Sequence, residues 1–161
     1  MTKGFISYAH DDHAEFEEIC THLAPLEHVF QIDFWRDKRI VPGNYWTQKI
    51  ADAIQDASVH LLLVTPRFLA SNYILHNELP AINAKYHAGD LVLPVILKRC
   101  MWQPFVGPLQ AAPMNPHGRL LAVVEWKPKA NGYDAARQQL QAAIEAHLGS
   151  PPVAPLIWDK P

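Results

Sequence analysis

Apolar positions along the chain fall into two kinds of pattern. Short, nearly continuous apolar runs occupy residues 4–8, 29–35, 59–64, 91–97 and 119–126. Between them, apolar residues recur three or four positions apart, as Phe16, Ile19 and Leu23 do, which is typical of a helix with one buried face. The run from Val59 to Val64 is polar only at His60, and this pattern favours a central parallel strand covered on both faces.

The order of these segments predicts the fold class. Strands that alternate with helical crossovers of this length form parallel sheets with helices on both faces. We therefore expect an α/β, three-layer, flavodoxin-like fold with a five-stranded parallel sheet. The side chain of Asp11 or Asp12 is expected to cap the first helix, and Pro25 is expected to end it.

The domain is expected to span residues 1–149, with a Pro-rich tail or linker at residues 150–161.

Ligands of open parallel sheets bind outside the carboxyl ends of the strands. Four segments that follow predicted strands should meet there: Tyr8, residues 36–43, residues 65–72 and the long, proline-containing loop 98–118. A loop of that length in a compact domain is usually functional or mobile.

Composition narrows the function classes. The net charge of -2 gives no long-range attraction to nucleic acids or anionic membranes. Two cysteines cannot form a disulfide framework, nine scattered histidines show no metal-ligand spacing, and no apolar run approaches about 18 residues. We therefore expect a cytoplasmic protein that has no metal site and does not span a membrane. The seven glycines form neither a dinucleotide-binding fingerprint nor a P-loop, and the nucleophile motif GxSxG is absent.

Asp11 and Asp12 resemble the acidic pair of response-regulator receivers, which share this order of strands and helices. A receiver also needs a phospho-accepting aspartate at the end of its third strand, where this chain has Val64, Thr65 and Pro66. The receiver interpretation is therefore disfavoured, since similarity of fold alone does not fix function.

Three segments together resemble the Toll/interleukin-1 receptor (TIR) family of the bacterial, NAD⁺-cleaving type. Residues 5–8 (FISY) are similar to its first motif, and residues 35–43, which end in IVPG, are similar to its second motif and BB loop. Residues 68–79 are similar to the segment in which enzymatic members carry a glutamate, here Glu78. Two positions depart from the family pattern: Ile74 stands where enzymatic members often have tryptophan, and Arg36 stands where many have an acidic residue, with Asp37 next.

The resemblance implies that Glu78 is the catalytic carboxylate of an NAD⁺ glycohydrolase or cyclase, with NAD⁺ as substrate and no cofactor. The residues it implies for substrate contact are Tyr8, His10, Arg36, Asp37, Arg39, Tyr73, Ile74 and Trp102. It also implies self-association, or association with other TIR domains, through the BB loop from Arg36 to Gly43, and a sensor partner or appended domain that controls activity.

Plainer interpretations remain open for the same residues. Glu78 could be a solvated helix residue favoured by the helix dipole, and the aromatic residues could be core or rim packing. Residues 36–39 could form a solvated charged turn, while Ser71 and Asn72 are expected to cap a helix. For the whole chain, the alternative to an enzyme is a non-catalytic TIR–TIR interaction module.

Overall fold

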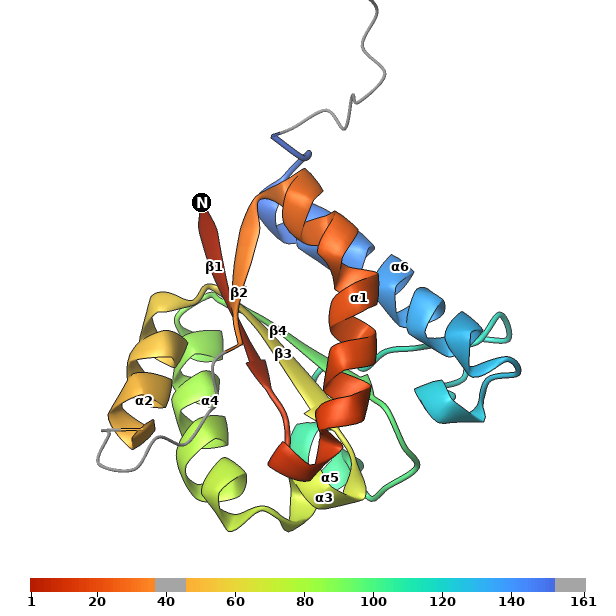
Figure 1. Ribbon diagram of the computed structural model, residues 1–161, viewed down its shortest axis with the longest axis horizontal. Helices are drawn as coiled ribbons and strands as arrows, with labels where there is room; N and C mark the ends of the chain where they lie inside the picture. Colours follow the sequence, from red (N-terminus) through yellow and green to blue (C-terminus); the bar gives the residue numbers. More distant parts are fainter. Residues whose placement is uncertain (37–45, 153–161) are drawn as a thin grey trace, which may run out of the picture.

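The computed structural model describes residues 1–36 and 46–152 (Figure 1). Asp37, Arg39 and the rest of the predicted BB loop up to Gly43 lie outside the described residues. Most of the predicted tail, residues 153–161, also lies outside them, so the division into a domain and a tail stays a prediction.

A parallel sheet forms the middle layer. Within the described residues it has four strands in the order β2-β1-β3-β4. The bounds are Thr2–Ser7 for β1, Ile32–Trp35 for β2, Val59–Val64 for β3 and Leu91–Ile96 for β4. Every residue of β3 is buried, as its continuous apolar run predicts for a central strand covered on both faces.

Helices cover both faces of the sheet. Helices α1 (His13–Phe30) and α6 (Lys129–Leu148) lie on one side, and α2 (Trp46–Asp56) and α4 (Leu79–His87) on the other (Figure 1). Each side has its own cluster of buried apolar residues. The remaining elements are short: η1 (His10–Asp12), α3 (Pro66–Ala70), η2 (Ile74–Glu78), α5 (Gln103–Val106) and η3 (Val123–Glu125). The predicted three-layer α/β fold is confirmed.

The predicted end of the first helix at Pro25 is wrong. Helix α1 continues through Pro25 to Phe30, because the buried residues Leu26 and Phe30 extend its apolar face beyond the proline. Pro25 itself is exposed. The backbone hydrogen bond that its missing N–H would have made is therefore lost on the solvent side of the helix rather than in the core. The helix ends at Gln31, whose φ of 54° is left-handed and whose N–H bonds to the carbonyl of Glu27.

The predicted fifth strand, residues 119–126, is also wrong. The free edge of β4 is taken by Ala112, whose N–H donates to the Pro94 carbonyl over 2.9 Å and whose carbonyl accepts from the Ile96 N–H over 2.8 Å. Residues 119–126 therefore do not add a fifth strand beside β4. Their backbone instead forms one isolated bridge, between Met114 and Leu120, and the 3-10 turn η3.

Gly132 of α6 packs directly against this irregular segment. A Cβ atom there would lie 2.3 Å from the Val123 carbonyl oxygen and 2.9 Å from Cδ1 of Trp126. We expect Gly132→Ala to lower the free energy of unfolding by about 1–3 kcal/mol, because backbone must move to make room. Urea unfolding measures this. Helix propensity alone predicts that Gly132→Ala raises the free energy of unfolding, by about 0.5–1 kcal/mol. A variant more stable than wild type would therefore contradict the close packing at Gly132.

His60 is a fully buried titratable group at the opposite end of the sheet from the strands' carboxyl ends. Its Nε2 lies 3.0 Å from Oδ2 of Asp90, an oxygen that also lies 3.4 Å from Nζ of Lys85. Burial lowers the pKa of His60 despite the opposing effect of Asp90. The imidazole is therefore kept neutral in the folded state at a pH where the unfolded chain already binds a proton.

A pH dependence of stability follows from the lowered pKa of His60. Below about pH 6.5 the unfolded state binds a proton that the folded state does not, so stability falls as the pH falls. The slope contributed by one such group is at most about 1.4 kcal/mol per pH unit. We expect the free energy of unfolding between pH 7 and 5 to fall less steeply in His60→Leu than in wild type. Parallel curves for the two proteins would show that His60 does not titrate in this way.

Candidate functional site

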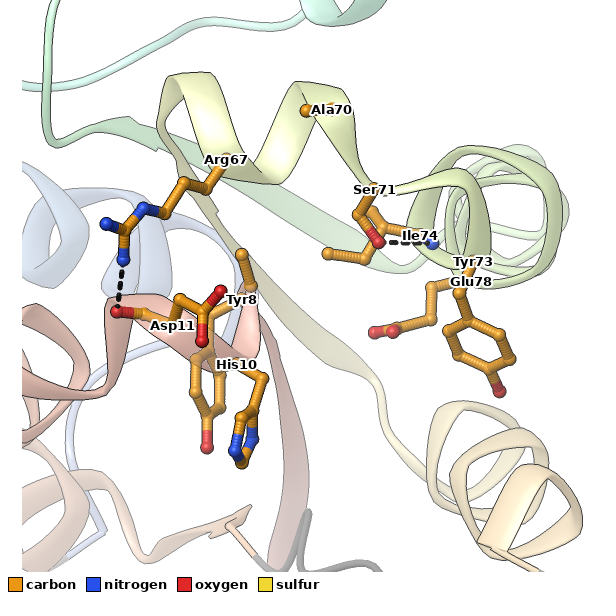
Figure 2. Close-up of a pocket in the computed structure, with 10 residues that line it drawn as sticks. Tyr8, His10, Asp11, Arg67, Ala70, Ser71, Tyr73, Ile74 and Glu78 are labelled. Carbon is orange, nitrogen blue, oxygen red and sulfur yellow. Dashed lines mark hydrogen bonds between the residues drawn. The ribbon is translucent and has the colours of Figure 1, made fainter.

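A hollow of about 400 Å³ opens where β1 and β3 end (Figure 2). Three short segments enclose it: the turn after β1, helix α3 after β3, and the π-helical turn η2. Its lining residues are Tyr8, Ala9, His10, Asp11, Arg67, Ala70, Ser71, Tyr73, Ile74 and Glu78. The carboxyl edge of the sheet, where parallel folds bind ligands, thus carries a cavity large enough for part of a nucleotide.

Glu78 is the buried carboxylate of this hollow. Only 3% of it is exposed, and Oγ of Ser7 donates a hydrogen bond to its Oε1 over 3.0 Å. Figure 2 shows its carboxyl group directed into the space between η2 and the turn that carries Tyr8 and His10. The interpretation of Glu78 as a solvated helix residue is therefore wrong.

The local sequence explains how Glu78 is presented. Residues 74–78 form a π-helical turn, in which the N–H of Leu79 bonds to the carbonyl of Ile74, five residues earlier. Pro80 lies directly after Leu79. In a regular α-helix a proline has no N–H to donate, and its ring would clash with the carbonyl four residues earlier. The wider turn avoids that clash, and single π-helical turns of this kind frequently occur at functional sites.

Two tyrosines lie beside the carboxylate. The Tyr8 ring stacks on Phe16, with centroids 4.0 Å apart and planes within 8°, so it packs in the core as well as lining the hollow. Burial, with smaller contributions from Cys20, Glu17 and Glu78, raises the pKa of Tyr8 to about 12. Burial, and then Glu78, also raises the pKa of the half-buried Tyr73. Both phenols are therefore neutral at physiological pH and can donate hydrogen bonds.

The structure brings together five of the residues predicted from the sequence. Tyr8, His10, Tyr73, Ile74 and Glu78 all line the hollow. His10 is exposed at its rim, whereas Ile74 is buried and presents an apolar surface where the family often has tryptophan. These residues come from two segments 63 or more positions apart, and the parallel topology brings them to the same edge.

Two other predicted contacts, Trp102 and Arg36, are not brought there. Trp102 does not line the hollow; it precedes α5 and packs, partly buried, on the apolar cluster of the α2 and α4 side. Arg36 is held elsewhere by an ion pair with Glu27 of α1 and is likewise not among the lining residues. Asp37 and Arg39 lie outside the described residues.

Sequence reasoning missed other lining residues. Arg67 on α3 reaches the hollow, and its Nη1 donates to the backbone carbonyl of Asp11 over 2.8 Å. Ser71 lines the hollow, and its Oγ accepts from the N–H of Ile74 over 3.2 Å, so Ser71 caps the helical segment that begins at Asn72 and leads into η2. The available signal was that residues 65–72 follow a central strand, which places every polar side chain there near the carboxyl edge.

The predicted capping role of Asp11 or Asp12 is wrong. Asp12 occupies the N-cap position of α1, but neither it nor Asp11 makes a side-chain cap. Its buried Oδ2 instead accepts a hydrogen bond from the Thr65 hydroxyl, and the same hydroxyl accepts from the Phe68 N–H over 3.0 Å. Asp12 therefore ties the turn after β1 to α3, which holds two walls of the hollow together.

Two further findings concern residues 1–36 and 46–152. No group of three or more His, Cys, Asp and Glu side chains in those ranges is arranged to hold a metal ion. No helix within them is long and apolar enough to cross a membrane.

Comparisons with known proteins connect the chain to a family. The family described as "TIR domain" matches residues 5–141. The uncharacterized protein y4lF of Sinorhizobium fredii (strain NBRC 101917 / NGR234) is 34% identical over 118 residues, which is 71% of this chain and 36% of that protein. This chain thus spans about a third of that relative's length.

Among solved structures, the chain is similar to the TIR domain of the Toll-related receptor TRR-2 from the lower metazoan Hydra magnipapillata. The TM-score is 0.50 at 17% sequence identity, over 87% of this chain and 96% of that chain, a likeness that concerns the fold alone. The family match, however, covers most of the sequence and includes the last three residues of β1, all of β3, Glu78 and the walls of the hollow. The chain belongs to the TIR-domain family.

Proposed function

We propose that the protein cleaves the nicotinamide–ribose bond of NAD⁺, as a glycohydrolase or cyclase, with Glu78 as its catalytic carboxylate. The observation that carries the proposal is the position of this side chain: it is almost fully buried, lines a hollow large enough for part of a nucleotide and is oriented by Ser7. A carboxylate kept from solvent in this way is preorganised to interact with charge that develops beside it.

The chemistry of NAD⁺ suits a site with a single carboxylate. The nicotinamide nitrogen is already positive in the substrate, so nicotinamide leaves neutral and needs no proton donor. Positive charge develops on the ribose, as in glycoside hydrolysis, and Glu78 would stabilise that charge or bind the ribose hydroxyls. Attack by water gives ADP-ribose, and attack by an atom of the same molecule gives a cyclic ADP-ribose isomer.

We further propose that activity depends on assembly of TIR domains through residues 36–43, so that NAD⁺ is consumed only on demand. Uncontrolled loss of NAD⁺ is toxic, which favours control by a sensor partner or an appended domain. A role in bacterial antiphage defence, or as an effector, would fit an enzyme that acts on NAD⁺ in the cytoplasm.

The test incubates concentrated protein with NAD⁺ and a crowding agent that favours assembly. Chromatography then measures the nicotinamide released. We expect wild type to release nicotinamide and Glu78→Ala to release far less. No release under any assembling condition, or equal release by the two proteins, removes the enzymatic proposal. The same chromatograms identify the product as ADP-ribose or a cyclic isomer.

The second candidate is a non-catalytic TIR–TIR interaction module. Two observations favour it: Ile74 replaces the tryptophan common in enzymatic members, and Trp102 does not reach the hollow. This candidate predicts that the chain associates with itself or with another TIR domain without consuming NAD⁺. Association measured by light scattering, together with an unchanged NAD⁺ concentration, would support it over the enzyme.

A further inference from the structure

Arg67 is the unassigned charged residue of the hollow. It lies on α3, which follows the central strand β3, and its side chain is exposed to the cavity that Glu78 also lines. It is the one lysine or arginine among the described lining residues. Its contact with the Asp11 backbone carbonyl uses one of the five N–H donors of the guanidinium and leaves its positive charge in place. Arg67 makes no ion pair with any residue that the structure describes.

Arg67 and Glu78 lie apart across the hollow. Figure 2 shows Arg67 on the side formed by α3 and the turn after β1, and Glu78 on the side formed by η2. Arg67 and Glu78 thus place opposite charges on two sides of the hollow, with the Asp11 carboxylate close to Arg67 and Glu15 near enough to feel its charge. An anionic group is repelled from Glu78 and attracted to Arg67, whereas a ribose that acquires positive charge is favoured beside Glu78.

We propose that Arg67 binds the pyrophosphate of the dinucleotide and thereby fixes its orientation, with the nicotinamide ribose toward Glu78. A guanidinium presents a planar set of donors that matches phosphate oxygens, and its bond to the Asp11 carbonyl orients that plane before substrate arrives. This inference rests on the proposed function for the identity of the ligand. It adds Arg67 to the substrate contacts that the resemblance implied from the sequence.

Binding of ADP-ribose tests the proposal without relying on catalysis. Isothermal titration calorimetry, under the assembling conditions used for activity, would compare wild type with Arg67→Gln. We expect affinity to fall about 10- to 100-fold, since charge-assisted hydrogen bonds are lost. Arg67→Lys, which keeps the charge but not the planar fork, should retain part of the affinity.

Arg119→Gln is the matched control, because it makes the same change at an exposed arginine that does not line the hollow. Its affinity for ADP-ribose should equal that of wild type. Equal affinity of Arg67→Gln and Arg119→Gln, or absence of ADP-ribose binding by wild type, overturns the assignment.

Kinetics separate this inference from the proposed function. If nicotinamide is released, Arg67→Gln should lower the ratio of kcat/KM for NAD⁺ to kcat/KM for nicotinamide riboside, which has no phosphate, by about 10- to 100-fold. An unchanged ratio overturns the role of Arg67 and leaves the enzymatic proposal intact. Binding of ADP-ribose through Arg67 without nicotinamide release removes the enzymatic proposal and leaves the anion site intact.

Discussion

Glu78→Gln is expected to lower the rate of nicotinamide release from NAD⁺ by about 10²–10³-fold. Glutamine has the shape of glutamate and keeps an oxygen that can accept the hydrogen bond from Ser7. It lacks the negative charge that would stabilise the developing positive charge on the ribose. The loss should therefore appear mainly in kcat, with little change in KM, and chromatography of nicotinamide over a range of NAD⁺ concentrations measures both.

Glu145→Gln provides the control for this experiment, because it removes one negative charge from an exposed position of α6 far along the chain from the hollow. It should release nicotinamide at the wild-type rate. The fold of Glu78→Gln is checked by its thermal unfolding, which should resemble that of wild type. If the folded variant retained wild-type kcat, another group would have to stabilise the reacting ribose.

The sequence predicted those parts of the fold that local pattern determines. Residues 59–64 and 91–96 form strands because continuous apolar runs suit positions buried on both faces. Residues 119–126 show a similar run, yet the edge of β4 was already taken by Ala112. Whether an apolar run finds a strand partner depends on contacts between distant segments, and periodicity carries no information about them.

Pro25 shows a second limit of local reasoning. In the interior of an isolated helix, proline is about 3 kcal/mol less favourable than alanine. This cost is the reason for expecting the first helix to end at Pro25. Burial of Leu23, Leu26 and Phe30 along the same helix face outweighs that penalty. Tertiary packing therefore decides where α1 ends.

The candidate site was predictable to the extent that motifs fixed it. The resemblance identified Glu78, Tyr8 and Tyr73, and all three line the hollow. Arg67 was missed because α3 carries no family motif at that position, and its role depends on the turn after β1 that it contacts. Trp102 was assigned by similarity of position after a strand, but its indole packs on the apolar cluster instead.

Phe68→Ala is expected to lower the free energy of unfolding by about 3–5 kcal/mol. Phe68 is completely buried on α3, within the apolar cluster of the α2 and α4 side, and its removal leaves a cavity beneath the hollow. Domains of this kind are stabilised by about 5–15 kcal/mol in total, so this one side chain supports a large part of the fold. Urea unfolding followed by far-UV circular dichroism measures the change.

Phe105→Ala makes the same substitution where the ring is 44% exposed, and it should lower the free energy of unfolding by only about 1 kcal/mol. Phe68→Leu, which leaves a smaller cavity, should lie between the two alanine variants and remains measurable if Phe68→Ala does not fold. Because α3 carries Arg67 and Ala70, destabilisation at Phe68 should also open one wall of the hollow. Equal losses at positions 68 and 105 would mean that α3 is not anchored through this ring, and that polar contacts such as those of Thr65 with Asp12 and of Arg67 with Asp11 hold that wall in place.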